Sequence, residues 1–303
     1  MTTFAQGSRT QVAYVAESTY GTTPATPTTI VIPIVSFAVN ATKDQLEDNS
    51  IRSDRMQRYS LDGNTHVSGD FDVNLNNHNF DPFIASAFTG TWTTNVLKFG
   101  TAVTPSFTFE VGQLDIAEYW LYTGVVIDKM QLTISTTGVV TTKFTTIGKA
   151  TAPITATSIC ATPTAVTEHP PFTAQPGTFK EAGSVTGVFQ ALSLTIDNQT
   201  TANFVLGSAT AANLSSGMVK ATGTATVMFQ DAVIANKFLN GTASTIDFIL
   251  TDGTNTLEFN LPNVKYTGAA RTVSGQGPVT LAVTFTALYD SASSTVCTVT
   301  RSS

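Results

Sequence analysis

The chain has 303 residues, of which 42% are hydrophobic and only 12% charged, and its formal net charge is −6. This length suggests about two domains, and a charged fraction well below the roughly 25% of typical soluble proteins indicates that other subunits cover part of the surface. The negative charge argues against a groove that grips nucleic acid, because such grooves rely on Lys and Arg contacts to phosphate. A channel through which nucleic acid slides remains open.

Residues 1–34 are expected to form an N-terminal arm. The arm lacks the basic and apolar regions of a secretory signal, so we expect a protein that is made and assembled in a cytoplasm. The longest apolar stretch, residues 30–39, is interrupted by Pro33 and is shorter than the about 20 residues of a membrane helix. We therefore expect no membrane insertion. Cys160 and Cys297 lie far apart and are expected to be free thiols.

Residues 35–150 form the first of two predicted units, and residues 43–62 within it are unusually rich in charge. A solvated loop is one interpretation of such a run. Apolar side chains set among charges of both signs are typical of a polar interface with buried anchors, and favour an arm that contacts another subunit. The residues assigned to this arm are Asp48, Ile51, Arg52, Asp54, Arg55, Met56, Arg58 and Tyr59.

Period-two alternation over residues 67–75 predicts a half-buried strand. The apolar set is Phe71, Val73 and Leu75, and the polar set is Asp70, Asp72 and Asn74. An acid and base pair for catalysis is conceivable for the two aspartates, but no His, Arg or pocket motif accompanies them. We expect the polar set to line a channel, with an acidic wall that keeps DNA from sticking.

A short helix is predicted after this strand. Asp81 is placed to cap it, Pro82 suits its first turn, and Gly90 should end it. Ile84 and Phe88 lie four residues apart and should anchor one face on the sheet.

The second half of the chain repeats these features. Gly223 stands 154 positions after Gly69, each glycine opening an alternating strand, and Asp231 repeats Asp81 150 positions later. Ile234 and Phe238 then match the anchors of the first helix, and Gly241 ends the second. The run at 277–284 matches 138–145, and Asp252-Gly253 predicts a hairpin between strands 245–251 and 254–261. We therefore predict a second unit over residues 185–290, a Pro- and Thr-rich linker over 151–184, and a loose or partner-bound tail over 291–303.

Signals for catalysis or for cofactors are missing from the sequence. It has no nucleophile elbow, phosphate-binding loop or paired metal-ligand motif. His66, His78 and His169 have no spacing that would place two of them on one metal ion. We expect no enzyme, no cofactor and no metal.

Four segments, RTQVAYVAESTYGTTPATP (9–27), DNSIRSDR (48–55), VSGD (67–70) and ASAFTGTW (85–92), resemble the tail tube proteins of long-tailed, non-contractile bacteriophages. The resemblance implies a fold of two packed β-sheets with a flanking helix. Together with the internal repeat, it predicts a mainly β chain with two tandem copies of a tail-tube-type sandwich or barrel unit, each with one short flanking helix. It also implies that subunits close into rings, that inner strands join into one barrel, and that rings stack into a tube that conducts viral DNA.

The resemblance further implies that the 43–62 arm reaches a neighbouring ring or subunit, and that other tail proteins are partners. The resemblance implies a ring with six copies of the unit. Because this chain is predicted to carry two copies, three chains would form a ring with pseudo-sixfold symmetry. The alternative from another class is a secreted β-sandwich binding module of the carbohydrate-binding or adhesin type. It explains the Thr-rich strands, but not the missing signal peptide or the charged arm in one half only.

Overall fold

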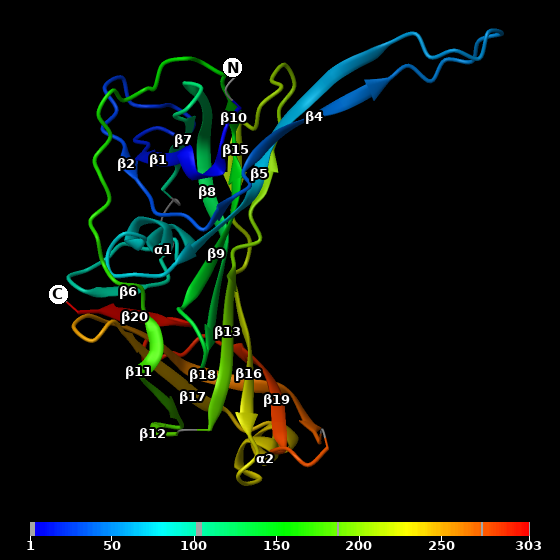
Figure 1. Ribbon diagram of the computed structural model, residues 1–303. Coiled ribbons are helices and arrows are strands. Elements are labelled where there is room, and N and C mark those ends of the chain that lie inside the picture. The colour runs from blue at the N-terminus through cyan, green and yellow to red at the C-terminus, as the bar shows by residue number, and fades with distance from the viewer. Residues whose placement is uncertain (1–3, 101–104, 187, 274, 303) are drawn as a thin grey trace.

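In the computed structural model, residues 4–100, 105–186, 188–273 and 275–302 are described, and they form mainly antiparallel strands (Figure 1). The elements of the first half are η1 (Gly7–Arg9), β1 (Thr10–Ala16), β2 (Ile30–Val31), β3 (Ser36–Phe37), β4 (Asn40–Glu47), β5 (Ser60–Asn74), α1 (Asp81–Ala87), β6 (Val96–Lys98), β7 (Phe107–Gln113), β8 (Glu118–Ser135), β9 (Thr141–Gly148) and β10 (Ala150–Thr151). Those of the second half are β11 (Thr173–Glu181), β12 (Ser184–Val185), β13 (Phe189–Asp197), β14 (Thr201–Asn203), β15 (Asn213–Ser215), β16 (Lys220–Met228), α2 (Val233–Asn240), β17 (Ser244–Thr251), β18 (Thr256–Thr272), β19 (Thr280–Ala287) and β20 (Thr298–Arg301). The mainly β fold class predicted from the alternating patterns is confirmed.

One order of strand pairing runs through both halves: β4, β5, β9, β8, β13, β16, β19, β18, β17, β11. The joint between the halves is the antiparallel pair of β8 and β13, in register from Lys129 with Asp197 to Ser135 with Ala191. In Figure 1 the first half lies above the second, and β13 runs between them. The halves are therefore connected by backbone hydrogen bonds as well as by the linker.

The two halves have the same internal connections. β5 pairs with β9 as β16 pairs with β19, and β7 pairs with β8 as β17 pairs with β18. β1 pairs with β7 as β11 pairs with β17. The long strands β8 and β18 even shift register at matching places, around Asp128 and around Thr267. Each half thus has the strand order of the other.

Phe71 of β5 shows how each half encloses a core. Its ring lies 5.1 Å from Phe144 of β9, 5.5 Å from Phe83 of α1 and 5.8 Å from Phe109 of β7. β7 and β1 therefore fold over the sheet of β5 and β9, with α1 between them, which is a sandwich arrangement. The second half encloses Phe248, stacked 5.1 Å from Phe259. Buried side chains of both halves form one continuous cluster.

Gly69 and Gly223, the first pair of matched glycines, both permit a close approach of neighbouring strands. A Cβ on Gly69, whose φ is 151°, would lie 2.2 Å from the carbonyl oxygen of Ala38. A Cβ on Gly223 would lie 2.2 Å from the ring of Phe285 and 2.6 Å from the carbonyl oxygen of Ser193. The repeated glycine therefore has a packing reason in each half.

Three assignments made from the sequence need correction. β1 lies within the predicted N-terminal arm, yet Val12, Ala13 and Tyr14 are buried, because the strand pairs with β7 at the core. β11 lies within the predicted linker and pairs with β17. β20 lies within the predicted loose tail and pairs with β18 and β6, with Val299 buried. Each segment is ordered by long-range pairing.

The helices begin and end close to the predicted residues. Asp81 is the first helical residue of α1 and not its N-cap, which is Phe80, and α1 ends before Gly90, with Phe88 as its C-cap. Asp231 precedes the N-cap of α2, and its Oδ1 accepts a hydrogen bond from the backbone N–H of Val233 at 2.9 Å. Gly241 is the C-cap of α2 in the left-handed conformation that glycine adopts easily, as predicted.

Candidate functional site

The polar set of β5 lies on one face of the sheet. Phe71, Val73 and Leu75 are fully buried, whereas Asp70 and Asp72 are partly exposed and Asn74 is exposed. The alternation thus places the two sets on opposite faces, as expected. Whether the polar face lines a channel depends on assembly.

Lys143 of β9 lies between the two aspartates. Its Nζ is 3.8 Å from Asp70 Oδ2 and 3.9 Å from Asp72 Oδ1, and Ser36 Oγ donates a hydrogen bond of 2.7 Å to Asp72 Oδ2. Strands 67–75 and 141–148 are neighbours in the sheet, so a lysine at a polar position of the second faces acids of the first. The sequence carried this signal in the alternation around Lys143, but not the pairing of the two strands.

Strand register continues the polar face across both halves. One row of paired residues is Asp72, Lys143, Gln131, Thr195, Thr222, Thr286 and Lys265, on β5, β9, β8, β13, β16, β19 and β18. The row beside it is Asp70, Thr145, Lys129, Asp197 and Lys220. Paired residues of antiparallel strands share a face, so the face is one polar, Thr-rich surface.

The charge of this face differs from the acidic face we expected. Lysines accompany its acids, and Lys129 Nζ lies 3.0 Å from Asp197 Oδ2. Asp197 belongs to the second half and Lys129 to the first, so this ion pair crosses the joint of β8 and β13. The face is therefore of mixed charge, because flanking strands place lysines beside the aspartates of β5.

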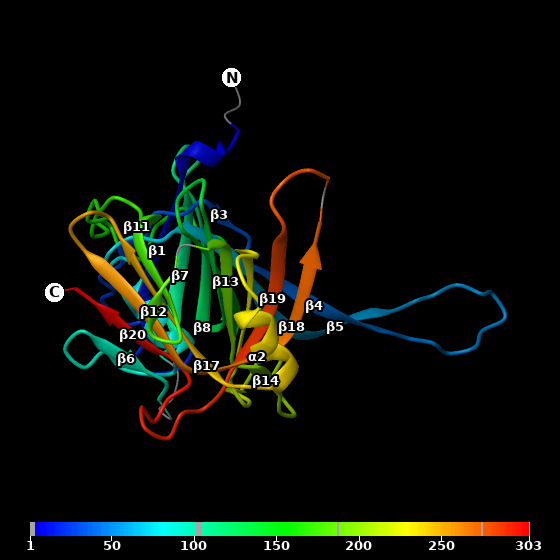
Figure 2. The ribbon, with the colours of Figure 1, turned by 90° about the horizontal axis from the view of Figure 1, so that it is seen from below.

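The charged arm is a long hairpin that leaves the body of the protein. Figures 1 and 2 both show β4 and the start of β5 extending far beyond the other strands. Every residue of β4 is exposed. At the tip, Ile51 is fully exposed and Met56 is 71% exposed. The arm therefore presents apolar side chains to solvent in the single chain.

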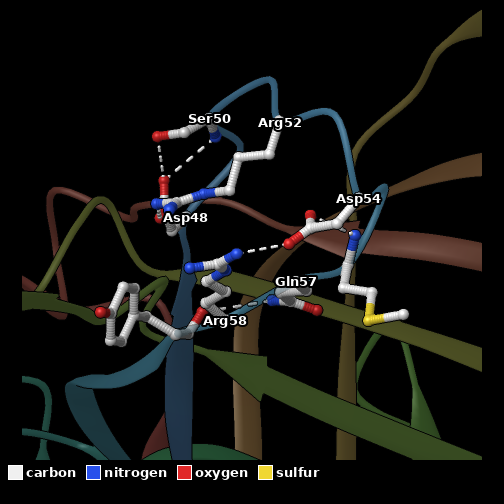
Figure 3. Close-up of polar contacts among 8 residues, drawn as sticks. Asp48, Ser50, Arg52, Asp54, Gln57 and Arg58 are labelled. Carbon is white, nitrogen blue, oxygen red and sulfur yellow. Dashed lines mark hydrogen bonds and ion pairs between the residues drawn. The ribbon is translucent and has the colours of Figure 1, made fainter.

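Two ion pairs order the tip of the arm (Figure 3). Arg52 Nη2 lies 2.8 Å from Asp48 Oδ2, and Arg58 pairs with Asp54 in the same spacing of four residues. Hydrogen bonds from Ser50, and then from Arg52, hold the pKa of Asp48 below its usual value. The tip has a defined local structure even though it projects away from the core.

The predicted helix anchors are buried to different extents. Ile84 on α1 and Phe88, the C-cap of α1, are buried, and Phe88 stacks on Phe99 at 4.4 Å. Ile234 and Phe238 on α2 contact the core but are only partly buried, and α2 has no fully buried residue. The rest of the chain therefore buries α1 more completely than it buries α2.

Histidines and cysteines form no metal-binding cluster in the part of the chain that is described. His78 and His169 come together with ring centroids 6.3 Å apart, a proximity that the sequence did not indicate. No group of three His, Cys, Asp or Glu side chains placed to hold a metal ion occurs among the described residues. Cys160 and Cys297 are free thiols, as predicted, and burial raises the pKa of Cys297. None of the helices in the described ranges has the length and apolar character to cross a membrane.

The described chain is a mainly β protein that presents a projecting hairpin and a continuous polar face. The family model described as phage tail tube protein matches residues 7–287, and the chain belongs to this family. No curated protein matches the chain. The family is structural and not enzymatic, and its members are components of the virion tail that assemble into a tube with other tail proteins. The family match gives no support to the alternative of a secreted binding module.

Proposed function

We propose that three copies of this chain close into a ring, and that rings stack into a tube that delivers viral DNA into the host cell. The observation that carries the proposal is the joint of β8 and β13, which connects two halves of equal strand order edge to edge. If the halves are two tandem copies of one unit, that joint is one instance of a contact that would recur between neighbouring chains. Repetition of a head-to-tail contact generates a closed ring when the rotation fits.

The free strand edges of the chain support this closure. Among the described residues, β4 pairs only with β5, and residues 265–272 of β18 pair only with β19. β18 corresponds to β8, and the β3–β4 edge corresponds to β13. Pairing β18 of one chain with the β3–β4 edge of the next would remove exposed edges that otherwise invite aggregation.

The polar face suits a channel wall. In the proposed ring, Asp70, Asp72 and Asn74 face the bore together with the Thr, Lys and Asp side chains of the neighbouring strands. Ion pairs with aspartates neutralise Lys129 and Lys143 within the wall, so the described residues of the face form no continuous row of free cations. DNA would therefore pass without sequence-specific contacts, since firm binding needs many Lys and Arg contacts to phosphate.

The charged arm acts between subunits in this proposal, with Ile51, Met56 and Tyr59 as its apolar contacts. A neighbouring subunit would cover these side chains, which the single chain leaves in water. Assembly takes place in the host cytoplasm, where other tail proteins join the tube.

Negative-stain images of the purified protein at rising concentration, together with native mass spectrometry of single rings, test the proposal. Hollow rings of three chains that stack into tubes are expected. Rings of six full-length chains would refute the pseudo-sixfold arrangement. A protein that stays monomeric at all concentrations would refute the proposal that this chain forms rings by itself.

A further inference from the structure

The joint inside the chain contains a second contact besides the strand pair. After β13, the loop of residues 198–219 crosses onto the first half at the register shift of β8 and at the end of α1. The backbone N–H groups of Asn198 and Thr200 donate to Asp128, at 2.9 Å to its carbonyl oxygen and 2.6 Å to its Oδ1. Asn198 Nδ2 donates to the carbonyl oxygen of Ala87, the last residue of α1, at 2.9 Å.

This loop has a counterpart in the first half, which is the arm. Val67 pairs with Ala41 as Ala221 pairs with Ile196, so Lys43 stands at the position of Asn198. Counting two residues on, Gln45 stands at the position of Thr200. Within the described chain, the 198–219 loop lies against the other half, whereas β4 at the base of the arm has backbone pairing only with β5.

The surface that the loop covers in the first half also has a counterpart, and it is open. Thr267 lies at the register shift of β18, where Asp128 lies in β8, and it is exposed. At the end of α2, Leu239 is 74% exposed. We call the surface formed by Thr267 and residues 237–240 the α2 corner.

We propose that the base of the arm, residues 43–47, of one copy docks on the α2 corner of the neighbouring copy in the same ring. This contact rests on the proposed ring. It assigns the base of the arm to the adjacent subunit of the same ring and not to the adjacent ring. The backbone N–H of Gln45 would donate to Thr267, as Thr200 donates to Asp128.

We assign the α2 corner to another copy of this chain because the joint inside the chain shows the equivalent contact between its own two halves. The contact would cover the apolar side chain of Leu239, which the single chain leaves in water. It uses only the base of the arm, so the tip with Ile51 and Met56 remains available for the adjacent ring.

Cross-linking tests the contact. Gln45→Cys and Thr267→Cys, two exposed positions, are combined in a Cys160→Ser background and treated with a short bis-maleimide after assembly. Cys297 is 0% exposed and should stay unreactive. The matched positive control is Thr200→Cys with Asp128→Cys, the same contact inside one chain. The negative control is Gln57→Cys at the tip with Thr267→Cys.

The expected result is a ladder of cross-linked chains in denaturing gels. The ladder should stop at the number of chains in one ring, which is counted in end-on images. A series that continues past one ring would overturn the proposal, because the arm base would then contact the next ring. Tubes that form without cross-links, while the positive control reacts, would also overturn it. Deuterium exchange on unmodified tubes gives a second measurement, and unprotected amides at residues 43–47 would contradict the contact. Failure of the proposed function is separate, since the unmodified chain would then form no rings.

Discussion

The different cover of the two helices can be measured with a matched pair of substitutions, Phe88→Ala and Phe238→Ala. Phe88 is 0% exposed and stacks on Phe99, so its truncation leaves a cavity in a closed core. Such a change should lower the free energy of unfolding by about 3 to 5 kcal/mol. Phe238 is only partly buried, on a helix without a buried residue. Folding removes less apolar area of Phe238 from contact with water, and truncation at this open site creates no closed cavity. The expected loss of unfolding free energy is therefore about 1 to 2 kcal/mol.

The assay is equilibrium urea unfolding followed by far-UV circular dichroism, at concentrations where the chain is monomeric. The denaturant slope should be the same for both variants, because the surface exposed on unfolding is nearly unchanged. Equal losses for the two variants would refute the reasoning, since they would mean that α2 is as well covered in the free chain as α1. A larger loss for Phe238→Ala would refute it as well.

Three further predictions concern packing, the arm and the polar face. Gly223→Ala should destabilise the chain by about 1 to 3 kcal/mol, because its Cβ would overlap a neighbouring ring and carbonyl; a thermal melt equal to that of the unmodified protein would contradict this packing. The combination Arg52→Glu with Arg55→Glu should weaken ring stacking or subunit joining, seen as fewer or shorter tubes in negative stain, but change monomer stability by under about 0.5 kcal/mol; tubes from a clearly destabilised monomer would show that the arm acts inside the chain. Changing Asp70 and Asp72 to Lys should make DNA retention in the tube salt-sensitive, because added cations bind phosphate; normal DNA delivery by phages with this variant would count against the channel face.

The sequence predicted those elements whose pattern is local. The alternation around Phe71 placed the buried and polar faces of β5 correctly, and the turn residue Gly241 located the end of α2. The charged run singled out residues 43–62 as an arm, and these residues lie in an exposed hairpin; the contact of this arm with another subunit stays a prediction. These features depend on neighbours within a few residues, which a single sequence displays.

Segments ordered by distant partners were missed. β11 contains Pro176 and Gly177 and pairs with β17 through a register shift, so its alternation is broken. β20 is a short strand whose Val299 is buried by β18 and β6, which come from opposite halves. The lysines on the polar face were missed for the same reason, since only strand order shows that Lys143 lies beside Asp70 and Asp72.

The joint of β8 and β13 also affects how a ring would assemble. Each association of separate subunits loses translational and rotational freedom, worth roughly 4 to 15 kcal/mol. In the proposed ring, every second joint is already formed within a chain, so that loss arises in the two associations that join three chains and not in the five that would join six separate subunits. In the proposed ring, fusion also allows the two positions to differ: the hairpin at 43–62 is exposed, whereas the segment at 198–219 lies against the other half. Projecting arms at alternate positions would leave each added ring three equivalent orientations on the growing tube, where a ring of six identical subunits would offer six.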